Sequence, residues 1–124
     1  LDLPPATRVA MFCDNSNEAW LSKIAIAKAG FVAAPVNVMM APDVILETLA
    51  HVDAQIAIVD EPQWVRLGER LRAAGVTPVM SIGGGEHGAA PDFDAFIAAF
   101  PATEPDVRIH GDDVWEVLFT SGTT

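Results

Sequence analysis

The run Arg8-Val9-Ala10-Met11-Phe12-Cys13 and the segment that follows it, residues 18–29, decide the fold class of this chain. After its first residue the run is short and uniformly apolar, which is typical of a buried strand. The following segment is predicted to be a helix, because Asn15 and Glu18 have the spacing of a capping box and Gly30 suits a helix C-terminus. A strand followed directly by a helix is the unit from which parallel sheets are built.

The apolar positions of that helix predict which side faces the core. Trp20, Ile24 and Ala27 recur at helical spacing, so we expect them to point inward. Ser22 and Lys23 are then expected to point outward. We expect core positions, rather than a stacking platform, for all of the tryptophans: Trp20, Trp64 and Trp115.

The alternation of apolar and amphipathic segments continues along the chain. Further strands are predicted at residues 31–36, 55–59, 77–82 and 114–119. Further helices are predicted at residues 63–73 and 92–100, and one begins at Pro42 and turns Ile45, Leu49 and Val52 inward. The sequence therefore predicts an α/β fold, with a mainly parallel sheet and helices on both faces.

Composition limits the classes of function. The 124 residues carry a formal net charge of −10, which argues against nucleic-acid binding because that requires a basic surface. No run approaches the ~18 uncharged apolar residues of a membrane span. Asp2, Pro4 and Pro5 do not suit a signal peptide, so we expect a cytoplasmic protein.

Several other candidate sites carry little signal. Cys13 is the one cysteine, which rules out an internal disulfide, and its apolar strand predicts a buried, inert thiol. His51, His87 and His110 are scattered, without a carboxylate or a second histidine at ligand spacing, so no metal site is predicted. The glycine-rich residues 83–88 lack the lysine of a nucleotide loop, and we interpret them as a surface turn.

The last five residues, Thr120-Ser121-Gly122-Thr123-Thr124, have the composition of a phosphate-binding loop. Small side chains allow a polyphosphate to approach main-chain N–H groups, and Gly122 permits a positive φ angle. From Glu86 onward the chain has eight acidic residues and one basic residue, Arg108, so backbone N–H groups must bind the anion. Such clusters after strands are also ordinary turns, and on composition alone both interpretations stay open.

Residues 112–124, Asp-Asp-Val-Trp-Glu-Val-Leu-Phe-Thr-Ser-Gly-Thr-Thr, resemble the approach to, and the first half of, the signature loop of the adenylate-forming enzymes. This superfamily includes acyl-CoA synthetases, the adenylation domains of peptide synthetases, and luciferases. Residues 28–37, from Lys-Ala-Gly to Pro-Val-Asn, resemble a second family segment, and residues 8–16 resemble the strand and Asn-Ser near the family's start. The matches follow the family's order and cover most of the chain apart from roughly residues 61–105.

The resemblance implies a domain organisation. Residues 1–124 are expected to be part of the large N-terminal domain of an adenylate-forming enzyme, truncated at the Thr-Ser-Gly-Thr-Thr loop. The family's loop continues with Gly-x-Pro-Lys-Gly, which this chain lacks. The remainder of the N-terminal domain and the C-terminal domain are then absent as well.

The resemblance also implies a function. The parent would be an acid-thiol ligase of the acyl-CoA synthetase type that uses ATP with Mg²⁺ to convert a carboxylic acid into its acyl adenylate, releases pyrophosphate, and passes the acyl group to coenzyme A. Asn37 resembles the acyl-CoA synthetases of fatty acid metabolism more than the peptide synthetases. No catalytic residue or metal ligand is assigned within the chain, which by itself is expected to be inactive and to self-associate. The residues implied to hold the β- and γ-phosphates are Thr120, Ser121, Gly122, Thr123 and Thr124.

The alternative is a non-enzymatic α/β binding module of the flavodoxin-like or receiver-like kind. Asp14 would then be an acidic site after the first strand, and Thr120 a switch residue. A receiver needs a lysine after a late strand, and this sequence has no lysine beyond Lys28. The residues that follow Thr124 in the parent gene would separate the two classes.

Overall fold

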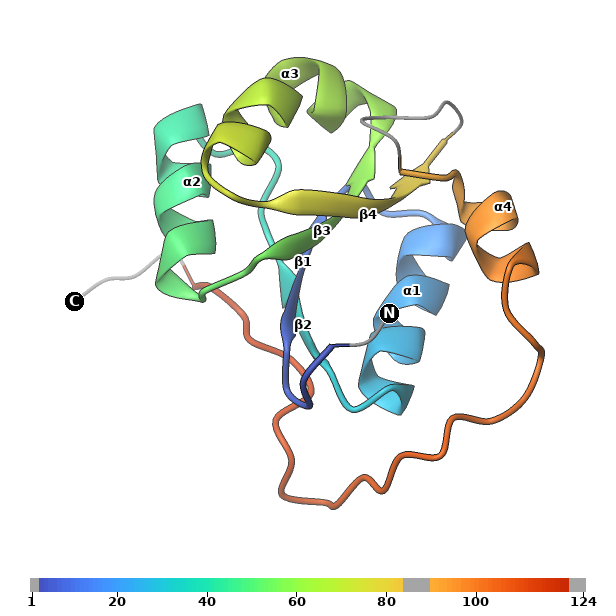
Figure 1. The fold of residues 1–124 in the computed structure, drawn as a ribbon. Coiled ribbons are helices and arrows are strands. Elements are labelled where there is room, and N and C mark those ends of the chain that lie inside the picture. Colours follow the sequence, from blue (N-terminus) through green and yellow to red (C-terminus); the bar gives the residue numbers. More distant parts are fainter. Residues whose placement is uncertain (1–2, 84–89, 121–124) are drawn as a thin grey trace.

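The structure, a computed structural model, describes residues 3–83 and 90–120. Its elements, in chain order, are β1 (Arg8–Phe12), α1 (Asn17–Lys28), β2 (Val32–Pro35), α2 (Pro42–His51), β3 (Ile56–Asp60), α3 (Glu61–Ala73), β4 (Thr77–Ile82) and α4 (Phe93–Ala98) (Figure 1). The predicted alternation is confirmed as far as α4, and the ends of the elements differ from the expected ones by a residue or two.

The strands form one sheet with parallel neighbours in the order β2-β1-β3-β4. Helices α1 and α4 cover one face of this sheet, and α2 and α3 cover the other, as Figure 1 shows. The predicted α/β fold is therefore confirmed. Within residues 3–83 and 90–120, no helix is long and apolar enough to cross a membrane.

Strand β1 lies in the middle of the sheet and contributes to two cores. Ala10 and Phe12 belong to the cluster that packs against α2 and α3, whereas Val9 and Met11 belong to the cluster that packs against α1. All four side chains are buried, because helices cover both faces of a parallel sheet. The inward stripe predicted for α2, Ile45, Leu49 and Val52, is buried as expected.

Helix α1 presents a different face to the core from the one predicted. Its buried residues are Ala19, Ser22 and Ile26, whereas Trp20 is 60% exposed. Ser22 tolerates burial because its hydroxyl donates a hydrogen bond of 2.7 Å to the Glu18 carbonyl.

The N-terminus of α1 also differs from the expectation. Ser16, and not Asn15, is the N-cap, and its hydroxyl accepts a hydrogen bond of 3.0 Å from the Ala19 N–H. Both residue types are favoured at this position, so the sequence alone could not separate them.

The core prediction for the tryptophans is right for one of them. Trp64, on α3, packs partly buried against the cluster beneath α2 and α3. Trp20 and Trp115 are exposed by 60% and 45%. The Lys23 ammonium lies 5.8 Å from the Trp20 ring centroid and 5.4 Å from that of Trp115, so both exposed rings lie within cation–π distance of one cation.

The strand predicted at residues 114–119 is wrong. One parallel bridge joins Glu116 to Ala33 of β2, with hydrogen bonds of 2.9 Å from the Ala33 N–H to the Trp115 carbonyl and from the Val117 N–H to the Ala33 carbonyl. The next donor that β2 would offer belongs to Pro35, which has no N–H, so the pairing cannot continue.

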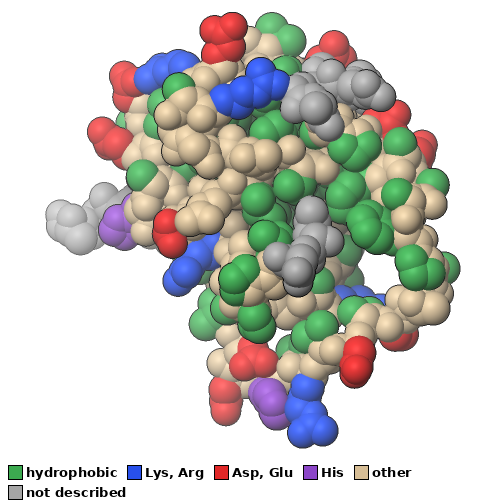
Figure 2. Space-filling view, in the orientation of Figure 1, with side chains coloured by type: hydrophobic (Ala, Val, Ile, Leu, Met, Phe, Trp, Pro, Cys, Tyr) green, Lys and Arg blue, Asp and Glu red, His purple; other side chains and the backbone are tan. Residues whose placement is uncertain are grey.

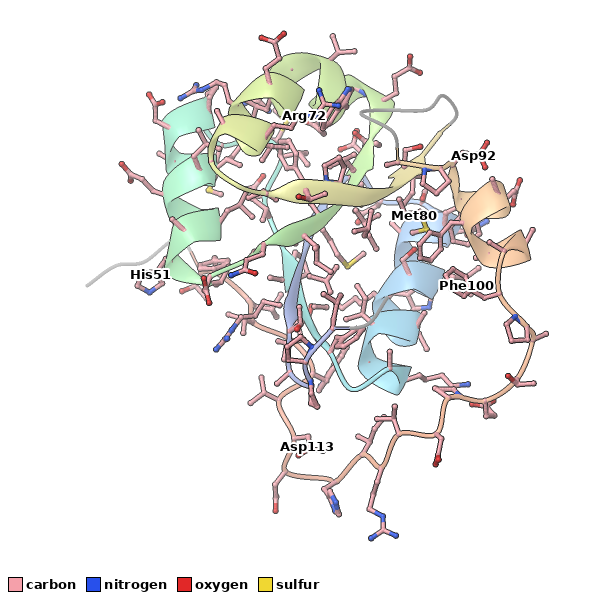
Figure 3. All side chains as sticks on the ribbon, in the orientation of Figure 1. His51, Arg72, Met80, Asp92, Phe100 and Asp113 are labelled. Atoms are coloured by element: carbon pink, nitrogen blue, oxygen red, sulfur yellow. The ribbon has the colours of Figure 1, made fainter. Side chains whose placement is uncertain are left out.

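An apolar groove of about 790 Å³ lies between α1, α4 and the sheet. Figure 2 shows hydrophobic side chains gathered on this face, and Figure 3 shows Met80 and Phe100 on the same side of the sheet. Ile97 and Phe100 are each 51% exposed at the groove. Exposed apolar surface of this kind favours association.

We predict that the 124-residue chain self-associates through this groove. Ile97→Glu would place a charge in the contact and should weaken the association constant about tenfold or more. Val65→Glu is the matched control, because Val65 is 78% exposed on α3, away from the groove, and the variant has the same net charge. Sedimentation equilibrium measures both. A wild-type chain that remains monomeric at high concentration would contradict the prediction.

Candidate phosphate-binding site

We expect the candidate loop, residues 120–124, at the carboxyl edge of the sheet. Because the bridge between Glu116 and Ala33 is parallel, residues 115–117 run in the direction of β2. Thr120 is exposed. Ser121, Gly122, Thr123 and Thr124 lie outside the described residues, so their phosphate role remains a prediction. Ligands of open α/β sheets bind at this edge.

Asp60, at the end of β3, organises the same edge, and sequence reasoning missed it. One carboxylate oxygen accepts a hydrogen bond of 2.6 Å from the Asp14 N–H, and the other accepts one of 3.0 Å from the Gln63 N–H. The residue is 7% exposed. It therefore caps α3 and fixes the loop after β1. An aspartate followed by Glu61-Pro62 is a helix-start signal that could have identified the cap, but not the bond to Asp14.

The loop after β2 is held by α3. The Arg66 guanidinium donates to the carbonyls of Val38 and Met40, in the second case at 2.6 Å. Asn37, the residue of the Pro-Val-Asn segment, accepts a hydrogen bond of 2.9 Å from the Met39 N–H through its side chain. Asn37 thus shapes the turn that leaves the sheet, and Arg66 fixes where that turn lies.

Asp113, in the segment before the candidate loop, bonds to the protein's own backbone. The Asp113 carboxylate accepts a hydrogen bond of 2.7 Å from the His110 N–H, which closes a turn before residue 114. In the part of the chain that the structure describes, no group of three or more His, Cys, Asp or Glu side chains is placed to hold a metal ion. These residues therefore do not fit a Mg²⁺ site, and a metal bound with a nucleotide would need other ligands.

Cys13 lies where β1 ends and packs against the cluster beneath α1 and α4. Burial, with smaller effects of the Asp60 and Asp14 charges, raises the pKa of the Cys13 thiol to about 12. The thiol is therefore protonated at neutral pH and cannot serve as a nucleophile. This agrees with the prediction of an inert cysteine, although the residue is half-buried rather than fully buried.

The remaining predicted features form no second site in the part of the chain that the structure describes. His51 ends α2, and His110 lies in the exposed stretch after α4. Gly83 has a φ angle of +89°, which suits the turn predicted there, whereas residues 84–88, including His87, lie outside the described part. Lys28 forms an exposed ion pair with Glu104.

Comparison with known proteins gives a consistent result. The family model of AMP-binding enzymes matches residues 1–124. A fatty acid--[acyl-carrier-protein] ligase, MmaC of Mycobacterium marinum, is 30% identical over 124 residues, which are 95% of this chain and 22% of that protein. The chain thus spans about a fifth of the length of this curated relative.

Solved structures share the fold. The anthranilate CoA ligase AuaEII, in complex with anthranoyl-AMP, superposes with a TM-score of 0.86 at 24% identity, over 98% of this chain and 24% of that one. A long-chain-fatty-acid-CoA ligase from Archaeoglobus fulgidus gives a TM-score of 0.86 at 18% identity, over 99% of this chain and 24% of that one.

The raised pKa of Cys13 predicts slow thiol chemistry. Relative to an ordinary thiol of pKa 9.0, a pKa of about 12 lowers the thiolate fraction at pH 8 by about a thousandfold. Iodoacetamide should therefore alkylate the native chain far more slowly than the chain unfolded in guanidinium. Because the folded thiol holds its proton more tightly, the contribution of Cys13 to the free energy of unfolding should be fully present below pH 9 and should be lost as the pH rises from about 9 toward 12. Equal alkylation rates in the native and unfolded chains would refute the assignment.

Proposed function

Because this chain belongs to the family of AMP-binding enzymes, we propose that it is part of the N-terminal domain of an ATP-dependent ligase. The ligase activates a carboxylic acid as its acyl adenylate and releases pyrophosphate. The parallel bridge between Glu116 and Ala33 is the observation that supports this best, because residues 115–117 then run in the direction of β2, whose carboxyl end lies at the edge where α/β sheets bind ligands.

In the activation step, a carboxylate oxygen of the acid attacks the α-phosphorus of ATP. A new O–P bond forms, the bond from the α-phosphorus to the bridging oxygen breaks, and its electron pair leaves with pyrophosphate. The role of this chain is to bind the leaving pyrophosphate. Backbone N–H groups and hydroxyls in residues 120–124 donate hydrogen bonds to oxygens of the β- and γ-phosphates. Donors that are already in place stabilise the developing charge without reorganisation.

The charge of this region requires a cation from elsewhere. Asp112 and Asp113 are exposed in the segment before the candidate loop, and Arg108 is the one lysine or arginine from residue 86 onward. Bound Mg²⁺ would neutralise part of the charge of the triphosphate. We assign its ligands, and a phosphate-binding lysine, to parts of the ligase outside this chain.

The acceptor of the acyl group is a thiol. Asn37, which resembles the residue found in acyl-CoA synthetases, supports coenzyme A as that acceptor. A carrier-protein thiol is the second candidate, because the relative that is 30% identical is named as a ligase of fatty acids to the acyl-carrier protein. Transfer assays with both thiols would separate them.

The alternative of a receiver-like or flavodoxin-like module has less support. The family match spans residues 1–124. Asp14, the acidic residue of that hypothesis, is exposed, and its main-chain N–H is bound by the Asp60 carboxylate. The receiver-like hypothesis needs an acidic pocket around Asp14 with a partner lysine, and these observations do not support such a pocket.

We predict that the 124-residue chain alone catalyses no adenylation. In the function proposed here, the Mg²⁺ ligands, the phosphate-binding lysine and the acid-binding pocket all lie outside these 124 residues. Pyrophosphate exchange into ATP, measured with a panel of carboxylic acids, should stay at background, while the product of the complete gene should be active with at least one acid. Exchange by the isolated chain above background would contradict this.

A second prediction concerns the order of the two half-reactions in the complete ligase. If residues 120–124 bind the departing pyrophosphate, Ser121→Ala, Thr123→Ala and Gly122→Val should each slow adenylation by on the order of 10²-fold. Transfer from a preformed acyl adenylate to the thiol should be nearly unchanged, because pyrophosphate has already left. Single-turnover kinetics of each step gives both rates.

The control for this experiment is a substitution that loosens the fold. Leu49→Ala, in the core beneath α2, should reduce both half-reactions in proportion to the unfolded fraction. If the loop variants behave like Leu49→Ala, with equal losses in both steps, the loop is a structural turn and not a phosphate site.

A further inference from the structure

Lys23 is the centre of a cluster that joins α1 to the segment leading to Thr120. Its ammonium forms an ion pair with the Glu116 carboxylate, and both side chains are largely buried, with 19% and 10% of their surfaces exposed. The same ammonium lies 5.8 Å from the ring centroid of Trp20 and 5.4 Å from that of Trp115. Ion pairs and cation–π contacts both strengthen where water is excluded.

The ion pair acts on the residue that makes the backbone bridge. Glu116 is paired with Ala33 of β2, and the flanking Trp115 carbonyl and Val117 N–H make the two hydrogen bonds of that bridge. The Glu116 side chain contacts α1, while Val117 packs against the cluster on the opposite face, beneath α2 and α3. The segment is thus fixed from both faces of the sheet at one point.

Few other contacts of the described residues hold this segment. The pairing cannot extend past Ala33 in either direction. On the C-terminal side, Pro35 has no N–H to donate to the segment. On the N-terminal side, the Phe31 N–H already donates a hydrogen bond of 3.1 Å to the Ile26 carbonyl. Around the bridge, Val114 is 63% exposed and Leu118 is 66% exposed. The side-chain cluster around Lys23 therefore carries much of the ordering.

We propose that Lys23 is a positioning residue for the phosphate-binding loop. By holding Glu116 and Trp115 against α1, it keeps residues 115–117 beside β2 and so sets where Thr120 and the residues after it begin. The role at the loop rests on the function proposed above for residues 120–124, whereas the ordering of residues 115–117 does not depend on it.

The test uses the product of the complete gene with four variants. Lys23→Met removes the charge at similar length, Glu116→Gln removes the partner's charge, the double variant tests their coupling, and Lys23→Arg keeps a cation that can bind a carboxylate and stack on indole rings. Lys28→Met is the matched control, because Lys28 lies on the same helix and its ion pair with Glu104 is exposed by 52% and 79%.

Two independent quantities are measured. Hydrogen exchange at the Val117 amide reports whether the bridge is closed, and it should become about tenfold faster in Lys23→Met and in Glu116→Gln. The double variant should resemble either single one, because both break the same contact. The KM for ATP in adenylation should rise about three- to tenfold in the same variants, while transfer from a preformed adenylate is unchanged. Lys23→Arg and Lys28→Met should resemble the wild type in both measurements.

Unchanged exchange at Val117 in Lys23→Met would overturn the positioning role. Faster exchange without any change in the KM for ATP would overturn its link to the loop. An equal effect of Lys28→Met would show that the loss of any positive charge from α1 produces these changes. That result would also overturn the positioning role of Lys23. A wild-type protein without adenylation activity would refute the proposed function, and the exchange data would still decide whether Lys23 orders the bridge.

Discussion

The parallel pairing of β1 with a strand on each side is the constraint on which the rest of the structure depends. Because β1 pairs with β2 and β3 in the same direction, each connection must cross back over the sheet, and helices become the cover of both faces. The side chains of Val9 to Phe12 are then all buried, and they alternate between the core on one face of the sheet and the core on the other. The same pairing places all carboxyl ends at one edge, so the loops that follow the strands meet there.

At that edge, the Asp60 and Arg66 side chains form hydrogen bonds with main-chain groups of the protein itself. Asp60 accepts hydrogen bonds from two main-chain N–H groups, and Arg66 donates to two main-chain carbonyls. Asp113 similarly closes its own turn. These bonds fix the loops, but they leave few cationic side chains for an anion. In a chain with a net charge of −10, an anion site at this edge has to rely on backbone N–H groups and on a cation brought by the ligand or by another part of the protein.

Sequence patterns predicted the individual helices and strands, but they did not predict contacts between residues far apart in the chain. Apolar runs and amphipathic periods identified β1 to β4 and α1 to α4, since these patterns are local. The face of α1 was misassigned because a serine bonded within its own helix can be buried, and a tryptophan beside a lysine can be exposed. The bond from Asp14 to Asp60 spans 46 positions, and no local pattern encodes it. The five residues of the candidate loop were found by composition and resemblance, and Thr120 alone among them lies in the described part.

Pro35 explains why the apolar run at residues 114–119 is not a strand, and it affects how the candidate loop is attached. A strand of six residues would be part of the sheet and could move only when the sheet opens. A single bridge with two backbone hydrogen bonds, supported by side chains around Lys23, can open locally at a much smaller free energy than global unfolding. The segment is thus positioned by the sheet without being buried in it. The missing N–H of one proline thus limits the pairing of this segment with the sheet to one bridge.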